Sequence, residues 1–240
     1  MNIKPLKDMI ALSDNIVFFG GAGVSTESQI PDFRSSHGLY HDRIESPYSP
    51  EEILSHDFFM EHTREFFRFY RSKMVYREAM PNKAHQALAR LEEMGKLRTV
   101  ITQNIDGLHQ KAGSQGVLEL HGSIHRNYCI QCGRFFDLDY VMQDEDIPRC
   151  DRCEGIVKPD VVLYGENLNE TTLHKAVEAI SHADVLMVGG TSLTVYPAAG
   201  LITYYSGNKL VLINKTTTLY DGRADLVYYA KIGELFETLL

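Results

Sequence analysis

The residues best suited to chemistry form a glycine-rich loop, GGAGVSTESQIPDFRS, at positions 20–35. The apolar run before it, 16–19, is short and rich in β-branched and aromatic residues, which predicts a buried strand. Glycine permits positive φ and lets a polyanion approach the backbone, so a strand followed by glycines predicts a diphosphate cradle. The dinucleotide fingerprint is incomplete, because Thr26 replaces its third glycine and no second strand carries the usual ribose-binding acid. The pentad 30–34 (IPDFR) instead supplies an acid, an aromatic ring and a guanidinium.

Small or polar residues also follow other expected strands. The apolar runs at 98–102, 117–120, 185–188 and 210–213 predict strands that alternate with helices, and hence a mostly parallel sheet covered on both faces. Ligands of such sheets bind at the carboxyl ends of the strands, so we expect one crevice there. Alone, each residue could be a turn or a cap. The residues after these strands are Gln103, Asn104, Ile105, Asp106, His121, Gly122, Gly189, Gly190, Thr191, Ser192 and Asn214.

These groups suggest a nucleotide site with a base. Asn104 and Asp106 offer an amide and a carboxylate two residues apart, which suits a carboxamide and a ribose. The 190–192 segment predicts a second phosphate or ribose cradle, and Asn214 could replace the missing ribose-binding acid. His121 would take a proton from a ribose hydroxyl, because imidazole titrates near neutral pH. The alternative is that it is a surface or structural histidine, one of 10 in the chain.

The four cysteines form two CxxC knuckles separated by seventeen residues, Cys129/Cys132 and Cys150/Cys153. Doubled knuckles in a polar insertion predict a zinc ribbon, whereas two redox CxxC pairs are the alternative. Four thiolates would fill the tetrahedral coordination of zinc, so the metal would fold the insertion and activate no water. This reasoning excludes a zinc-dependent hydrolase.

Composition narrows the class of protein. The 240 residues are 44% hydrophobic with a net charge of -8, which suits one large α/β domain with an insertion and disfavours nucleic acid as the ligand. The acidic surface favours lysine-rich peptide segments. No apolar run is long enough for a signal peptide or a membrane span, so we expect a cytoplasmic protein without disulfides that binds no membrane. We also expect a monomer.

The expected fold class is a Rossmann-like, doubly wound parallel sheet with an inserted small zinc-ribbon domain. Residues 1–35, 81–122 and 159–240 would form the Rossmann-like domain, 36–80 the helical part of the small domain, and 123–158 the zinc-binding module. Apolar patterns predict helices over 1–14, 82–94, 173–180, 197–205 and 232–240, and further strands over 161–164 and 226–229. Aromatic residues crowd 53–74, where a core and the wall of an apolar tunnel are both possible.

The motif set resembles the sirtuins, the NAD-dependent protein-lysine deacylases, as a single catalytic core of the bacterial and archaeal type. The matching segments are GAGVSTESQIPDFRS, TQNID, the His-Gly pair at 121–122, the two CxxC knuckles, GTSL and VYPAAG. They cover almost the whole chain in the family's order. The resemblance implies a cleft in which NAD meets an acyl-lysine peptide, and one structural Zn²⁺ bound by the four cysteines.

The resemblance also implies individual roles. His121 would be the catalytic base, and Asn104 would orient the ribose and water. Ala22, Thr26, Phe33 and Arg34 would belong to the cofactor-binding loop, while Gln103, Ile105 and Asp106 would line the nicotinamide and ribose pocket. Phosphates and adenosine would contact Thr191, Ser192, Asn214, Lys215 and Ile232. The acyl-lysine side would comprise Val162, Tyr164, Gly165, Glu166, Asn167 and Val195.

The implied reaction is NAD-dependent deacetylation of protein lysine, which transfers the acetyl group to ADP-ribose and releases nicotinamide and O-acetyl-ADP-ribose. Mono-ADP-ribosyl transfer and removal of longer acyl chains in the same cleft are alternatives. Succinyl-removing members carry Tyr-x-x-Arg where this chain has Phe67 and Tyr70, and an unpaired carboxylate in an apolar tunnel is costly, so acidic acyl groups are disfavoured. Gln29 replaces a glycine of the family, which would strain the loop if the position needs positive φ.

Overall fold

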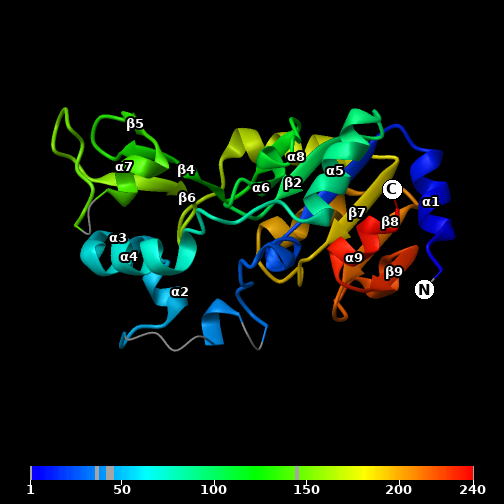
Figure 1. Cartoon of the computed structure of the whole chain (residues 1–240), viewed down its shortest axis with the longest axis horizontal. Coiled ribbons are helices and arrows are strands. Elements are labelled where there is room, and N and C mark those ends of the chain that lie inside the picture. The colour runs from blue at the N-terminus through cyan, green and yellow to red at the C-terminus, as the bar shows by residue number, and fades with distance from the viewer. Residues whose placement is uncertain (1, 36–37, 42–45, 144–145, 240) are drawn as a thin grey trace.

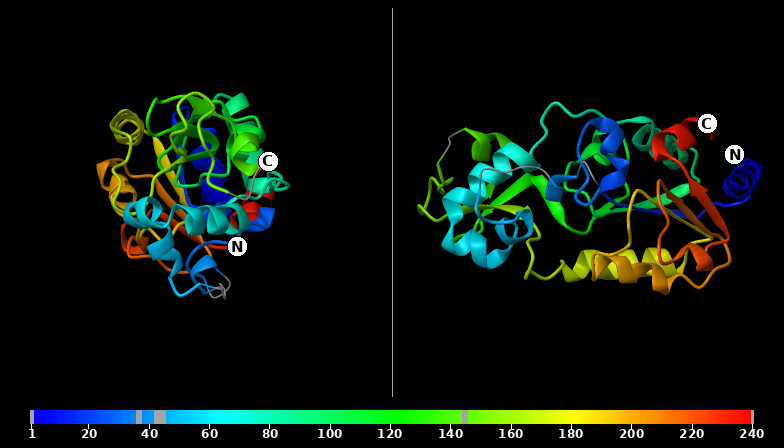
Figure 2. Two further views of the ribbon diagram at one scale, coloured as in Figure 1. Left: turned by 90° about the vertical axis from the view of Figure 1, so that its left-hand side faces the viewer. Right: turned by 90° about the horizontal axis from the view of Figure 1, so that it is seen from below.

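The computed structural model describes residues 2–35, 38–41, 46–143 and 146–239. The chain forms a main lobe and a small lobe side by side (Figure 1); the right-hand view of Figure 2 shows the same elongated arrangement from below, and the left-hand view looks along it. α1 lies at the end of the main lobe that is farthest from the small lobe. Among the described residues, none of the helices is long and apolar enough to cross a bilayer.

The main lobe is built on a six-stranded parallel sheet in the order β3-β2-β1-β7-β8-β9. The chain winds outward from β1 in one direction and returns beside it with β7, so the topological switch point lies between these two strands. Their last residues, Gly20 and Gly189, are paired, which places the expected crevice at this end. The strands are β1 (Ile16–Gly20), β2 (Leu97–Thr102), β3 (Val117–Glu119), β7 (Val185–Gly189), β8 (Leu210–Asn214) and β9 (Leu226–Tyr229).

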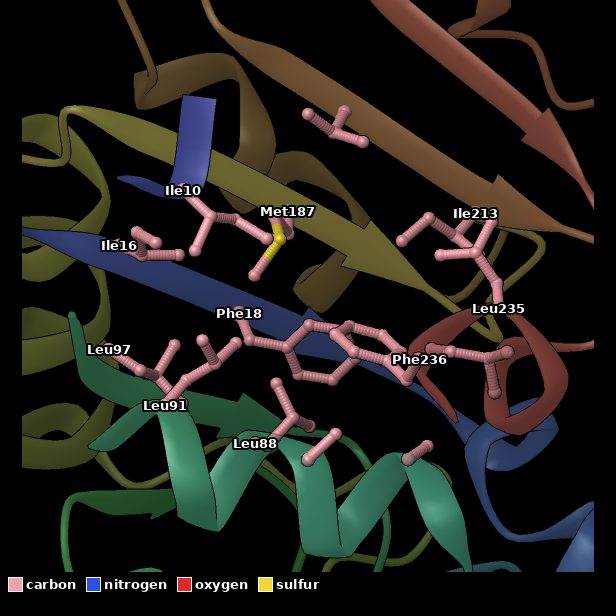
Figure 3. Close-up of a cluster of buried hydrophobic side chains, with 14 of the residues drawn as sticks. Ile10, Ile16, Phe18, Leu88, Leu91, Leu97, Met187, Ile213, Leu235 and Phe236 are labelled. Atoms are coloured by element: carbon pink, nitrogen blue, oxygen red, sulfur yellow. The ribbon is translucent and has the colours of Figure 1, made fainter. Parts of the chain in front are cut away.

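Helices cover both faces of this sheet, as the alternation of strands and helices predicts. Alternate strand residues point to opposite faces, so Phe18 packs on one side while Val17 and Phe19 pack on the other. Figure 3 shows Phe18 between Leu88 and Phe236, and the two phenyl rings meet edge to face at 6.1 Å. One face carries α1 (Lys4–Ala11), α5 (Lys83–Glu93) and α9 (Ile232–Glu237); the other carries α8 (Glu170–Ser181) and a 3-10 helix, Ala198–Tyr204.

The small lobe combines two separate stretches of chain around one core. Phe59 and Phe66 from the first stretch share a buried cluster with Val141 and Val157 from the second. The antiparallel sheet has the order β5-β4-β6. The first stretch contains α2 (Pro50–Ile53), α3 (His56–Glu61) and α4 (Thr63–Phe69); the second contains β4 (Gly122–Cys129), β5 (Phe135–Phe136), α7 (Leu138–Met142) and β6 (Val157–Val161). Most of the aromatic-rich 53–74 segment is therefore core.

Local sequence signals explain several boundaries. Ser49 and Glu52 form a capping box at α2, with Pro50 in the first helical position. Asn82 caps α5 by accepting from the Ala84 amide, and Gly95 ends that region with φ +70°. A π-helical turn, Tyr70–Met74, follows α4 directly.

Three expectations differ from the structure. The strand expected over 161–164 in the main sheet is wrong, because β6 ends at Val161 and pairs antiparallel with β4 in the small lobe. The expected domain boundary between 158 and 159 therefore falls inside a strand. The helix expected over 197–205 is a 3-10 helix, Ala198–Tyr204. The strand expected over 226–229 is confirmed at the edge of the main sheet.

Two histidines lie buried beneath the main sheet. The rings of His85 and His109 meet at 4.7 Å, and Phe18 lies beside His109. Burial lowers the pKa of His85 to about 3 and that of His109 to about 4. Neither ring nitrogen of His109 has a hydrogen-bond partner in the described part of the chain, so nothing there stabilises a protonated ring.

We therefore expect acid to destabilise the fold through this pair. Unfolded histidines bind protons below about pH 6.5, whereas the folded pair resists protonation down to about pH 4, so the free energy of unfolding falls as pH decreases between these values. Urea unfolding at several pH values measures this. His109→Phe keeps an aromatic ring and should flatten the slope by about one proton between pH 6.5 and 5; an equal slope in parent and variant would contradict the expectation.

Candidate active site

The carboxyl ends of β1, β2, β7 and β8 open into a cavity of about 800 Å³ that residues of both lobes line. The structure thus brings together side chains that the sequence spreads over more than 200 positions. Predicted site residues that line the cavity are Ala22, Thr26, Phe33, Arg34, Gln103, Asn104, Ile105, Asp106, His121, Val162, Tyr164, Gly165, Glu166, Thr191, Ser192, Val195, Asn214, Lys215 and Ile232.

Asn167 is the exception, since it is exposed and does not line the cavity. The Glu166 amide donates to the Leu163 carbonyl at 2.9 Å, and Gly165 has φ +89°, so the chain turns before it reaches residue 167. Asn167 therefore lies outside the cavity lining, and its contact with the substrate backbone stays a prediction.

The glycines of the loop serve close packing against β7. A Cβ on Gly21 would lie 2.8 Å from the Thr191 Cβ, and one on Gly23 would lie 2.8 Å from the Gly190 Cα. None of the three glycines at 20, 21 and 23 has positive φ, so that part of the expectation is wrong. They are required because the loop touches the neighbouring strand end, which fixes the cavity wall.

Side-chain hydrogen bonds join the ends of three strands at the cavity floor. The Gln103 amide donates to the Thr191 hydroxyl at 3.1 Å, and the Thr191 backbone amide donates to Asn214 Oδ1 at 2.9 Å. Thr191 Oγ1 also accepts from the Leu193 amide. The ends of β2, β7 and β8 are thereby held in register, with Thr191 and Asn214 both buried.

A second chain of hydrogen bonds fixes the polar residues after β2. Asn104 Nδ2 donates to Ser25 Oγ at 3.0 Å, and the Ser25 hydroxyl donates to Asp106 Oδ2 at 2.7 Å. Asp106 Oδ1 accepts from the Leu108 amide at 2.9 Å. Burial raises the pKa of Asp106, while the hydrogen bonds from Leu108 and Ser25 oppose that shift. Ser25 thus links the glycine loop to both predicted ribose-pocket residues.

The imidazole of His121 has a defined tautomer. Its Nδ1 lies 2.9 Å from the Gln103 carbonyl oxygen, and because a carbonyl only accepts, Nδ1 carries the proton. The other ring nitrogen, Nε2, is then the basic one. Burial lowers the pKa of His121, although the hydrogen bond to Gln103 opposes this, so the neutral ring predominates at neutral pH. A neutral, oriented imidazole at a cavity wall is suited to act as a general base.

The carboxylate of Asp32 stabilises the turn that the IPDFR pentad (30–34) forms. Asp32 Oδ1 accepts from the amides of Arg34 and Ser35 at 3.1 and 2.8 Å, which stabilises the turn that carries Phe33 and Arg34. Earlier in the loop, Gln29 has φ 65° and ψ 18°, the left-handed conformation in which glycine is favoured. Because Gln29 has positive φ, the backbone strain expected for a residue with a Cβ at this position applies. Its side chain is exposed.

The wall opposite the loop follows β6. The Val162 amide donates to the His121 carbonyl at 3.0 Å, which ties this wall to the base. The carboxylate of Glu166 has partners within the protein. It accepts a hydrogen bond from the Leu163 amide and pairs with Lys158 Nζ at 3.1 Å and His56 Nδ1 at 3.0 Å. Its side chain anchors the segment and has no carboxylate oxygen left free of a partner.

The four cysteines meet at the tip of the small lobe as free thiols. Their sulfurs all lie within 4.8 Å of one another, with Cys129–Cys153 at 3.4 Å and Cys132–Cys150 at 3.7 Å. A tetrahedral zinc with Zn–S bonds of about 2.3 Å needs sulfurs about 3.8 Å apart. Both of these pairs join different knuckles, which fits one metal site and disfavours two separate redox pairs.

Sequence reasoning missed part of the lining. Tyr40, Met74 and Tyr76 reach the cavity from the helical stretch, and Ala230 reaches it from the main lobe. Tyr40 belongs to the short 3-10 turn Leu39–His41, for which no periodic pattern gives a signal. Met74 ends the π-helical turn after α4, a change of helix type that sequence periodicity does not reveal.

Comparisons with known proteins agree on one family. The model of the Sir2 family matches residues 21–197. The chain belongs to the Sir2 family. It is 61% identical over 99% of its length to a protein of Clostridium acetobutylicum named NAD-dependent protein deacetylase, covering 98% of that protein.

Solved structures of Sir2 proteins share the fold of this chain. One, described as Sir2 with p53 peptide and NAD+, has a TM-score of 0.88 at 40% identity, with 100% of this chain and 97% of the other covered. Another, which holds deacetylated p53 peptide and 3′-O-acetyl ADP-ribose, has a TM-score of 0.90 at 37% identity, covering 99% and 96%. The Rossmann-like fold with its inserted small domain is thereby confirmed for this Sir2 chain.

The cysteine cluster generates a stability prediction. Cys150→Ser removes one buried ligand of the proposed zinc, so we expect the small lobe to unfold or the protein to aggregate. Thermal unfolding and zinc content by elemental analysis measure the effect. Cys150 and Cys153 are equivalent as ligands, so Cys153→Ser should behave alike; a folded, fully active and zinc-free variant would refute the structural role.

Gln29 generates a second prediction. Gln29→Gly should stabilise the protein by up to about 1 kcal/mol, since a left-handed backbone costs a residue with a Cβ roughly this much and the exposed side chain loses no packing. The matched control is Gln29→Ala, which keeps the Cβ and should bring no gain. Urea unfolding measures both variants, and an equal gain in the two would show that the Cβ is not the cause.

Proposed function

We infer that this chain is an NAD-dependent protein-lysine deacetylase that transfers the acetyl group to ADP-ribose and releases nicotinamide and O-acetyl-ADP-ribose. The observation that carries the proposal is the oriented, neutral His121 beside the Asn104–Ser25–Asp106 chain in one cavity. The named function of the Clostridium acetobutylicum relative supports it, as do the peptide and ADP-ribose complexes of similar Sir2 proteins.

The cavity suits NAD in volume and in hydrogen-bonding groups. Its floor contains a buried donor, Asn214 Nδ2, with no partner among the described residues, and such a donor is costly unless a ligand accepts from it. Thr191, Ser192 and Lys215 border the same end and would hold the phosphates and the adenosine. Gln103, Ile105 and Asp106 would hold the nicotinamide and its ribose. Bound NAD supplies the ribosyl carbon from which nicotinamide leaves.

The protein's own contribution is orientation and proton transfer. His121 Nε2 is free to take a proton from a ribose hydroxyl, because Nδ1 is held by the Gln103 carbonyl. Asn104 is positioned by Ser25, so its amide orients the ribose and a water. Phe33, on the turn fixed by Asp32, closes the side of the cavity against water.

The peptide side of the cavity favours a neutral acyl group. Val162 and Tyr164 would line the acyl-lysine channel, while Gly165 and Val195 would lie along the substrate backbone. Phe67 and Tyr70 are buried in the small-lobe core and do not line the cavity, so neither position offers a cation to an acidic acyl chain. We therefore propose acetyl-lysine proteins or peptides as substrates.

The four cysteines would hold one Zn²⁺ with all four coordination positions filled. Such a site has no open position for water or substrate, so the metal's contribution is to the fold of the small lobe.

One experiment separates deacetylation from mono-ADP-ribosyl transfer. The enzyme is incubated with an acetyl-lysine peptide and NAD labelled in its adenosine half, and the products are separated by mass. Deacetylation places the label on a small acetylated product and removes the acetyl group from the peptide only when NAD is present. Label bound to protein or peptide would instead support the transferase.

We expect His121→Ala to lower kcat by about 10²- to 10⁴-fold while NAD still binds, because the variant removes the base and leaves the strand-end contacts. NAD affinity is measured by calorimetry and turnover by peptide mass. In the parent, the lowered pKa of His121 should keep kcat/KM constant to below pH 6.5, with the fall on the acid side only below that value. A variant with parental turnover would contradict the assignment.

A further inference from the structure

Two tyrosine hydroxyls meet across the cavity. The Oη atoms of Tyr40 and Tyr164 lie 2.5 Å apart, and the two residues are 124 positions apart in the chain. Both side chains line the cavity, and Tyr164 is 42% exposed. One hydroxyl donates and the other accepts, so this is a direct hydrogen bond between two walls of the site.

Tyr40 is attached firmly to the IPDFR turn. Its amide donates to the Phe33 carbonyl at 3.0 Å, and the preceding Leu39 amide donates to the Asp32 carbonyl at 2.7 Å. The Tyr40 ring meets the Phe33 ring edge to face at 5.5 Å, and the Arg34 guanidinium lies 5.4 Å from the Tyr40 ring centre. Any movement of Tyr40 therefore moves Phe33 and Arg34.

Tyr164 is attached just as firmly to the small lobe. Its amide donates to the Leu54 carbonyl at 2.9 Å, and its carbonyl accepts from the His56 amide at 2.9 Å. Glu166 holds the same segment through the Leu163 amide and Lys158. The Tyr164 hydroxyl is thus a fixed point to which Tyr40 binds.

The Tyr40 hydroxyl remains a donor at neutral pH. Burial and the hydrogen bond to Tyr164 both raise the pKa of Tyr40, so the proton stays on its oxygen. The hydrogen bond that Tyr40 donates therefore persists at neutral pH, where the imidazole of His121 is neutral.

We propose that Tyr40 and Tyr164 are positioning residues whose hydroxyl–hydroxyl hydrogen bond fixes the IPDFR turn, with Phe33 and Arg34, over the nucleotide end of the cavity. The proposal rests on the proposed function, because it assigns the nucleotide to that end. It predicts that the pair strengthens nucleotide binding without blocking the peptide. Neither hydroxyl can fix the IPDFR turn without the other, because the two form one hydrogen bond.

The test is calorimetric titration with ADP-ribose, which lacks nicotinamide and so measures binding without turnover. Tyr40→Phe and Tyr164→Phe each remove one hydroxyl and keep the ring, and each should weaken ADP-ribose binding by about threefold to tenfold. The double variant should be weakened by the same factor as either single one, because the two hydroxyls form one bond. KM for NAD should rise by a similar factor.

Tyr205→Phe is the matched control. The Tyr205 hydroxyl donates to the Asp184 carbonyl at 3.1 Å in the core on the far face of the sheet, and Tyr205 does not line the cavity. This variant should lose thermal stability and keep parental affinity for ADP-ribose. Thermal unfolding of all variants separates general destabilisation from the loss of positioning.

Three outcomes would overturn the proposal. Parental ADP-ribose affinity in both single variants would show that the pair positions nothing, and multiplicative losses in the double variant would show that the hydroxyls act separately. Tighter binding of an acetyl-lysine peptide to Tyr164→Phe would show that the pair obstructs the substrate. A parent chain that binds no ADP-ribose would overturn the proposed function as well, so the two failures are distinguishable.

Discussion

The site depends on the hydrogen bond between His121 Nδ1 and the Gln103 carbonyl. Gln103 is the first residue after β2, and its own amide group is held by Thr191 at the end of β7. The register of the parallel strands therefore determines the orientation of the His121 imidazole. A change in register between β1, β2 and β7 would turn the base away from the cavity, which makes the packing of the sheet core a requirement of the chemistry.

The main lobe could be predicted well because its signals are local and repeated. Buried strands in α/β sheets are continuous apolar runs, and the order of strands and helices then dictates a parallel sheet with its ligand site at the strand ends. The alignment of Asn104, Asp106, His121 and Asn214 around one cavity followed from that rule alone. The base role of His121 was inferred from its place at a strand end, whereas most other individual roles came from the family resemblance; all of them remain proposals.

The small lobe was harder to predict for physical reasons. Its strand β4 has few apolar residues in alternation, and β6 alternates over only five residues, while the helices and cysteines supply much of the shared core. The run at 161–164 was taken for a strand of the main sheet, because a short apolar run carries no signal that says which sheet it joins; the strand observed there, Val157–Val161, belongs to the small lobe. Tyr40 was missed because a short turn carries no periodicity, and its partner Tyr164 is remote in sequence.

Because the core of the small lobe combines two separate stretches of chain, it cannot be completed until the second stretch has been synthesised. The helices at 50–69 contribute phenylalanines to a cluster whose other half lies at 124–163, and β2, α6 (Leu108–Lys111) and β3 are synthesised between the two halves. The helical half therefore leaves the exit tunnel with an uncovered aromatic face and waits for about a hundred residues of further translation. During that interval the nascent chain exposes apolar surface that favours aggregation, and slow synthesis through the cysteine-bearing segment would prolong the exposure.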